Sequence, residues 1–429
     1  MQRFIVKSNF AKAVFESHFF RSIVALASSN ALSQVIPLLV IPLLTRLYSP
    51  DDFGFIATLV SICSILSVFA SGKFELAFVM AESEEERVRL FVLCFSLLTI
   101  FISVLSVITC SIFVYDYFFD LTFFLDKRYL LVPLVVLLLG MSNILYNLMN
   151  CEKKFKDLAL SSIVYSFVNN GVALALSFVS SIGLIAGEMV GRISVILYLK
   201  RSFSDKEILT KPRCFAFRFN KDLIKKYKKI PLYTIPSESM DVYTKQVPVY
   251  LMSFLDLMTP LGFYALTDKV LNKPVSIIGR AVSVTFRIRA AEDFVSYHSC
   301  RPILLKTFCL LIVLSVLPFT FLYIYAVEIF SWVFGEEWVT AGSYARILIP
   351  VFFMQFITSP LTYVFHIAGK QEVDFFLHIL MAIGLTSCFL YGYYISGGVE
   401  QALRFYAYTN GFIYFLYLLF AIKFSKRDS

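Results

Sequence analysis

The most constraining feature of the sequence is a succession of long, continuously apolar runs along almost the whole chain. A bilayer core about 30 Å thick is crossed by a helix of roughly 20 apolar residues. Strands of membrane barrels alternate apolar and polar residues, whereas these runs do not alternate. Hydrophobic residues make up 58% of the 429 residues and charged residues only 16%, which is more apolar than a soluble core requires. The sequence therefore predicts an all-α polytopic membrane protein.

The runs predict twelve transmembrane helices, six before and six after one polar segment. The predicted spans are 23–44, 53–80, 90–114, 129–149, 158–179, 182–199, 231–257, 261–286, 303–325, 344–367, 374–395 and 402–422. An even number of spans in each half gives both halves the same orientation in the membrane. We therefore expect two pseudo-symmetric six-helix bundles.

The polar segment between the two halves, residues 200–229, is strongly basic. It contains eleven Lys or Arg residues and three acidic residues, an excess of eight in a chain whose formal net charge is +9. We call this segment the strap. It predicts an N-terminal bundle at 1–199, a basic linker at 200–230 and a C-terminal bundle at 231–429.

The loops predict the orientation, because cytoplasmic loops are enriched in Lys and Arg. The basic set comprises both termini, the strap and loops 81–89, 150–157, 287–302 and 368–373. Both termini are therefore expected in the cytoplasm. On the opposite side, loop 326–343 is acidic, and the acidic run at 82–86 is interpreted as a solvated cytoplasmic loop. The basic residues lie between hydrophobic segments, so they do not indicate nucleic-acid binding.

Two similar short segments support the division into halves. Phe53-Gly54-Phe55-Ile56-Ala57 opens the second span and Leu261-Gly262-Phe263-Tyr264-Ala265 opens the eighth, as expected for an internal repeat. The first and seventh spans also contain prolines, namely Pro37 and Pro42, and Pro231, Pro236 and Pro248. Prolines within a span produce static kinks or hinges, and the sequence leaves both open.

Ionisable residues inside the predicted spans are the main candidates for function, because each is costly in lipid unless it faces a cavity or a partner. They are Lys73 and Glu75; Glu188 and Arg192; Glu238, Asp241 and Lys245; and Asp268, Lys269, Lys273 and Arg280. Spacings of three and four place Glu238, Asp241 and Lys245 on one stripe. A polar wall in a central cavity and an ion pair buried between helices both fit such a stripe, and two carboxylates beside one lysine favour the first. For His366 and His378 we expect structural roles.

Motifs of several enzyme classes are absent from the sequence. It has no Walker A sequence, no H-E-x-x-H and no G-x-S-x-G. Its eight cysteines are scattered without metal-ligand spacing. We therefore expect no enzyme activity, no cofactor and no metal site.

Several short stretches along the chain resemble a known family, namely 44–50, 52–54, 73–77, 261–266, 274–279, 333–338, 341–348, 359–361 and 369–371. Together they resemble the polysaccharide or O-antigen (Wzx-type) flippases of the multidrug/oligosaccharidyl-lipid/polysaccharide exporter superfamily. The segment Val333-Phe334-Gly335-Glu336-Glu337-Trp338 is the most specific of them. Lys73 departs mildly from the family pattern around it, whereas Glu75 matches it.

The resemblance implies two six-helix bundles around a central cleft that opens alternately to each side. It implies an oligosaccharide on an undecaprenyl diphosphate carrier as substrate, moved from the cytoplasmic to the periplasmic leaflet of the bacterial inner membrane. A polysaccharide polymerase, a chain-length regulator and membrane lipids are then candidate partners.

The candidate transport residues follow from this reading. We assign Lys245, Lys269, Arg280 and, less strongly, Lys73 to substrate binding. We assign Glu238, Asp241, Glu75 and Asp268 to coupling with H⁺ or Na⁺. The alternative in the same superfamily is a cation-coupled exporter of drugs or metabolites. A polymerase or membrane glycosyltransferase is less favoured, because it needs a large periplasmic loop.

Overall fold

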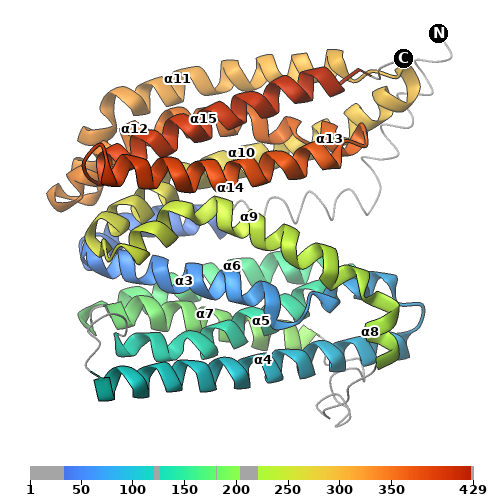
Figure 1. The fold of residues 1–429 in the computed structure, drawn as a ribbon, viewed down its shortest axis with the longest axis vertical. Helices are drawn as coiled ribbons and strands as arrows, with labels where there is room; N and C mark the ends of the chain where they lie inside the picture. Colours follow the sequence, from blue (N-terminus) through green and yellow to red (C-terminus); the bar gives the residue numbers. More distant parts are fainter. Residues whose placement is uncertain (1–32, 120–125, 180, 203–220, 427–429) are drawn as a thin grey trace. The chain divides into compact units, whose positions relative to one another are not determined.

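The computed structural model describes residues 33–119, 126–179, 181–202 and 221–426. Regular structure in these ranges is helical, apart from an isolated antiparallel bridge between Ser299 and Lys426. The chain divides into two compact units (Figure 1). The predicted all-helical membrane fold is confirmed.

Unit 1 comprises residues up to Pro37, Ile62–Leu176 and Ile182–Pro236. It contains the end of α3 (Pro50–Ala70), the 3₁₀ helices η1 (Phe74–Met80) and η2 (Lys127–Leu131), and the helices α4 (Glu84–Phe119), α5 (Val132–Cys151), α6 (Phe155–Ala175), α7 (Ser181–Ser202) and α8 (Lys221–Tyr227). Helix α5 packs against both α4 and α6. A proline in the first turn of α5, where no helical N–H partner is lost, favours its start there.

Unit 2 comprises Leu38–Ser61, Ser177–Ser181 and Ser237–Ser429. Its α-helices are the rest of α9 (Lys229–Phe254), α10 (Met258–Tyr297), α11 (Arg301–Phe334), α12 (Val339–Thr358), α13 (Val364–Ile367), α14 (Gln371–Tyr394) and α15 (Val399–Phe424). It also contains three short 3₁₀ helices, η3 (Ser177–Val179), η5 (Glu336–Trp338) and η6 (Ser359–Leu361). Helix α12 is central, because it packs against α10, α11 and α15.

Each of the twelve predicted spans overlaps a helix. Nine spans in the described ranges are long and apolar enough to cross a bilayer. Helices α9 and α10 are not among these nine, and both carry the predicted charges. The first span is described only from Ser33, as a helix that ends at Leu44. The structure is thus consistent with twelve spans.

The second predicted span is wrong in its extent. Helix α3 ends at Ala70, and residues 74–80 form the separate 3₁₀ helix η1. Gly72 and Lys73 have φ values of 63° and 59°, which an α-helix cannot accommodate. Lys73 and Glu75 therefore lie at a break after α3 and not inside a continuous span.

Predicted loops 81–89, 287–302 and 326–343 are largely helical, the first because α4 begins at Glu84. Helix α11 continues through Phe334 and α12 begins at Val339, so most of 326–343 is a helical hairpin. The backbone of Tyr325, where the predicted span ended, has non-helical φ and ψ. Beyond this kink Ala326 and Phe330 are each 1% exposed, so packing continues the helix. Helix α10 likewise extends through Tyr297, well into predicted loop 287–302.

The two repeated segments lie against each other in unit 2. A Cβ atom on Gly54 would stand 2.2 Å from the carbonyl oxygen of Met258, at the start of α10. A Cβ on Gly262 would stand 1.8 Å from the carbonyl oxygen of Pro50, at the start of α3. Each glycine thus allows the backbone of the other repeat to approach, which larger residues would prevent.

Candidate functional site

The stripe predicted on α9 forms an ion pair. Lys245 Nζ lies 2.6 Å from Asp241 Oδ2, and the two side chains are 68% and 45% exposed. Glu238 is half-buried three residues earlier on the same stripe. An exposed ion pair on a membrane helix costs free energy where it faces lipid, but little where it faces water. This arrangement fits a helix face that borders a polar space.

A ladder of cations follows one face of α10. Lys269, Lys273 and Arg280 share this face, since spacings of four and eleven correspond to one and three helical turns. Lys269 and Arg280 are exposed and Lys273 is half-buried. Lys269 Nζ lies 5.4 Å from the centroid of the Phe53 ring.

Sequence reasoning missed a fourth cation on this face. Arg287 follows Lys269 by eighteen residues, which is five turns. It is exposed, and its guanidinium carbon lies 4.6 Å from the centroid of the Tyr363 ring. The sequence analysis did not include Arg287 because the predicted span ended at residue 286. Its spacing of seven residues from Arg280, about two helical turns, nevertheless keeps it on the same face. The four residues form the α10 ladder, about 27 Å long from Lys269 to Arg287.

Asp268 lies one residue from the ladder and is half-buried. Asn272 Nδ2 donates a long hydrogen bond of 3.4 Å to Asp268 Oδ1. On α15, Asn410 Nδ2 donates a 3.1 Å hydrogen bond to Tyr406 Oη, while Asn410 Oδ1 is buried and has no hydrogen-bond donor among the described residues. Unit 2 therefore contains a buried amide oxygen on α15 and a half-buried carboxylate on α10.

Lys73 and Glu75 lie in unit 1, whereas the other six candidates lie in unit 2. Glu75 is 2% exposed, and Ser71 Oγ donates a 2.6 Å hydrogen bond to its Oε2. Lys73 is 9% exposed and precedes η1 in a left-handed backbone conformation. Of the eight candidates, Asp241 and Lys245 form an ion pair with each other.

The pair Glu188 and Arg192 belongs to a buried network in unit 1. Arg192 Nε donates a 2.8 Å hydrogen bond to Glu188 Oε1. Asn169 Nδ2 donates to Glu188 Oε2 at 3.1 Å, and Tyr165 Oη donates to the same oxygen. The sequence showed the pair but missed Tyr165 and Asn169 on α6. Both carboxylate oxygens have donors, which fits a structural role.

His378 also has structural contacts. Its Nδ1 lies 2.8 Å from Tyr417 Oη and 2.9 Å from the carbonyl oxygen of Asp374. The ring of His366 stacks on Tyr363, with centroids 5.4 Å apart. These contacts fit the expected structural roles of the two histidines.

A family profile described as "Polysaccharide biosynthesis protein" matches residues 43–343. The chain belongs to this polysaccharide biosynthesis family. The match spans most of the stretches that carried the resemblance, so the resemblance is confirmed at the level of the family. No curated protein sequence matches the chain.

Solved structures show which fold this family member has. It is similar to lipid II flippase MurJ in an inward closed conformation, with a TM-score of 0.69 and 15% identity over 93% of this chain and 87% of MurJ. It is also similar to an inward-facing multidrug resistance MATE family transporter of the MOP superfamily, with a TM-score of 0.63 and 12% identity over 92% of this chain and 93% of that one. A eukaryotic MATE transporter gives a TM-score of 0.57 and 14% identity over 95% and 98%. The family member therefore has the MurJ and MATE fold of transporters and flippases.

Proposed function

We propose that this protein flips an oligosaccharide linked to undecaprenyl diphosphate from the cytoplasmic to the periplasmic leaflet of a bacterial inner membrane. The family description and the MurJ-like fold support a lipid-linked substrate. In this proposal both termini are cytoplasmic, as the basic loops predict. The product becomes available to a polysaccharide polymerase and a chain-length regulator on the far side.

The observation that carries the proposal is the α10 ladder. Burying an unpaired diphosphate or a sugar hydroxyl in hydrocarbon costs several kcal/mol. Exposed cations on one face of a membrane helix replace water around phosphate oxygens with charge-assisted hydrogen bonds. The lipid tail can stay in the bilayer while the head group follows the ladder. Lys269 and Arg280 are the proposed contacts, with Lys245 on α9 and Lys73 in unit 1 as further cations.

Ion coupling is proposed to work through exchange of partners. Lys245 is paired with Asp241 in this structure. An anionic substrate that attracts Lys245 leaves Asp241, with Glu238 nearby, available to bind H⁺ or Na⁺. Substrate binding to Lys245 and cation binding to Asp241 then both depend on whether these two residues are paired. A shared dependence of this kind couples two binding sites. Asp268 and Glu75 are additional proposed carboxylates for the coupling ion.

Alternating access is proposed to involve bending of the first span and of α9. The boundaries between the compact units fall directly after Pro37 and Pro236, within these two helices. Proline removes a helical hydrogen bond and so lowers the resistance of a helix to bending. Hinges at these two prolines are therefore part of the proposal.

The alternative function is a cation-coupled exporter of drugs or metabolites, because the fold is shared with multidrug MATE transporters. The two functions differ in what accumulates after deletion. The flippase predicts loss of surface polysaccharide, with the lipid-linked intermediate held in the cytoplasmic leaflet. The exporter predicts drug sensitivity with normal polysaccharide.

Deletion of the gene with leaflet-specific labelling of the lipid-linked intermediate tests the proposal. We expect labelled intermediate only from the cytoplasmic side, and restoration of polymer when this chain is supplied. Normal polymer in the deletion strain would exclude the flippase. Drug sensitivity in the same strain would then establish the exporter.

A further inference from the structure

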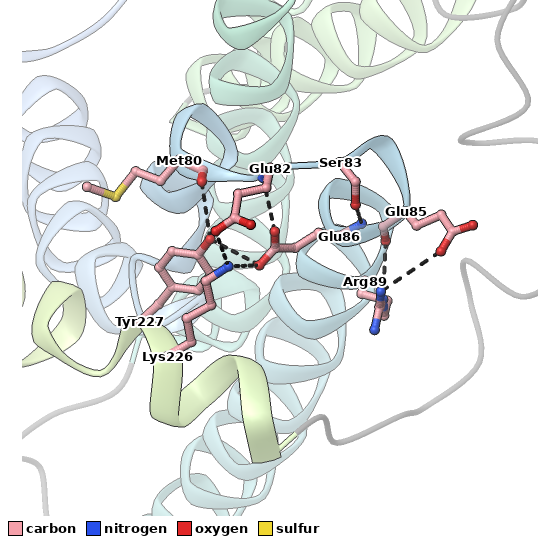
Figure 2. A network of polar contacts seen from close by, with 8 residues as sticks. All are labelled: Met80, Glu82, Ser83, Glu85, Glu86, Arg89, Lys226 and Tyr227. Carbon is pink, nitrogen blue, oxygen red and sulfur yellow. Dashed lines mark hydrogen bonds and ion pairs between the residues drawn. The ribbon is translucent and has the colours of Figure 1, made fainter.

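The described end of the strap is fixed to the start of α4 by polar contacts (Figure 2). Lys226 Nζ lies 2.7 Å from Glu86 Oε1 and 3.0 Å from Glu82 Oε1. Tyr227 Oη donates to Glu86 Oε1 at 3.1 Å and to the Met80 carbonyl oxygen at 3.3 Å. We call these contacts the clasp. The interpretation of 82–86 as a solvated loop is therefore wrong for Glu86, which is 8% exposed.

Local structure holds the Glu86 carboxylate in place on α4. The backbone N–H of Glu82 donates a 3.0 Å hydrogen bond to Glu86 Oε2. The backbone N–H of Glu86 in turn donates to Ser83 Oγ at 3.1 Å, directly before the helix begins. A serine there satisfies an N–H that the first turn leaves unpaired. The carboxylate is thus held by the backbone directly before α4 as well as by α8.

One face of α8 is buried against this site. Leu223 is 6% exposed and Tyr227, four residues later, is 7% exposed. Side chains four residues apart lie on the same face of a helix. By contrast, Lys225 is exposed. Helix α8 therefore docks through a defined face, with Lys226 at its edge.

The clasp lies close to the start of α9 along the chain. Helix α8 ends at Tyr227 and α9 begins at Lys229. The residues of α9 up to Pro236 belong to unit 1, together with α4 and α8. The stripe with Asp241 and Lys245 follows on the same helix, about 18 Å from Lys229 to Asp241.

We propose that Glu86 is a positioning residue which, through Lys226 and Tyr227, holds the start of α9 on unit 1. Loss of the clasp releases α8 and leaves the first turns of α9 without an anchor. This inference goes beyond the proposed function, since the clasp is defined without reference to any substrate. Its test needs no transport assay.

Thiol labelling of the purified full-length protein in liposomes tests the proposal. Leu223→Cys places a thiol on the buried face of α8, and mass spectrometry reports maleimide labelling at position 223 separately from the native cysteines. We expect Lys226→Glu or Glu86→Lys to raise the labelling rate about tenfold, because each removes a charge-assisted hydrogen bond. The exchanged pair, Glu86→Lys with Lys226→Glu, should return the rate to within about twofold of the parent.

Neighbouring residues provide matched controls. Glu85 is 90% exposed and Lys225 is exposed, so Glu85→Lys and Lys225→Glu make the same charge changes outside the clasp. These controls should leave the labelling rate unchanged. Equal rates in clasp and control variants, or no restoration in the exchanged pair, would overturn the proposal.

A milder substitution covers the case in which charge reversal prevents folding. Tyr227→Phe removes one hydroxyl group from a buried ring and keeps the packing. A rise in labelling at position 223 supports the clasp. A rate equal to that of the parent, in both Tyr227→Phe and Lys226→Met, contradicts it.

Discussion

The indole Nε1 of Trp338 donates a 2.9 Å hydrogen bond to the backbone carbonyl oxygen of Thr45. The indole is 0% exposed, and its ring packs edge-on against Phe53 and Phe263, with centroids 5.0 and 5.8 Å away. Stretches near 45 and 53, near 263 and near 338 therefore meet within unit 2, although Thr45 and Trp338 are 293 residues apart. All of them are among the stretches that carry the family resemblance, and their shared role here is packing.

Trp338→Phe should lower the free energy of unfolding by about 1–3 kcal/mol, because it leaves a buried carbonyl without its donor. Trp332 on α11 is 83% exposed, so Trp332→Phe is the matched control and should change stability by less than about 0.5 kcal/mol. Circular dichroism during denaturation in detergent measures both. Equal effects would contradict a specific role for the hydrogen bond.

Gly262→Ala should destabilise the protein by about 1–3 kcal/mol, because a methyl group must displace the start of α3. Gly279 lies in the same helix, and a Cβ there meets nothing within 4 Å. Gly279→Ala should therefore be neutral or stabilising, since alanine favours helix. Thermal unfolding of the two variants compares them, and a stable Gly262→Ala would show that the two helix starts can separate easily.

Neutralising the α9 pair should impair transport with little effect on folding. We expect Asp241→Asn with Lys245→Ala to lower transport by about tenfold or more, equivalent to about 1.4 kcal/mol. Glu400 and Arg404 form a comparably exposed pair at the same spacing, 3.2 Å apart. Glu400→Gln with Arg404→Ala is the control. Polymer at the parental level in the α9 variant, at equal membrane abundance, would exclude α9 from the site.

Removing one partner of the buried network should be more harmful than removing both. Arg192→Ala leaves the Glu188 carboxylate buried without its cation, at a cost of about 3 kcal/mol. Glu188→Gln with Arg192→Met should recover much of this loss. Unfolding and polymer assays on the double variant test the structural role of this pair: normal transport supports it, whereas a stable but inactive protein contradicts it.

The clasp should be insensitive to pH near neutrality and sensitive to salt. Hydrogen bonds to Glu86 and then Glu82 raise the pKa of Lys226 above its usual value of about 10.4. Because the folded-state pKa is raised, the stabilisation is complete below about pH 10 and is lost only as the pH rises through the higher value. The stability difference between the parent and Lys226→Met should stay constant from about pH 6 to about pH 9.

Salt should reduce the stability difference between the parent and Lys226→Met. Lys226 is 43% exposed and Glu82 is 80% exposed, so ions can screen their attraction. Between about 0.1 M and about 1 M salt the screening length falls from about 10 Å to about 3 Å, and the difference should shrink. Thermal unfolding of both proteins in each buffer measures it. A difference that vanishes by pH 9, or that grows with salt, would contradict the ion-pair account.

The sequence by itself determined the all-helical membrane fold and the family. Apolar runs of the required length have only one stable form in lipid, because every backbone polar group must find a partner within its own helix. Helical spacing, which depends only on local geometry, also placed Glu238, Asp241 and Lys245 on one stripe of α9.

Only the tertiary structure decided where α3 ends, that loop 326–343 is largely helical, and which side chains meet across the chain. Hydropathy measures the free energy of moving a side chain out of water, so it does not indicate the left-handed backbone at Gly72 and Lys73. Hydropathy likewise predicts that the acidic run at 82–86 is solvated, because Lys226 on α8, which contacts Glu86, lies 140 residues away in the sequence. Contacts between distant segments, such as Glu86 with Lys226 and Trp338 with Thr45, depend on packing that no single segment encodes.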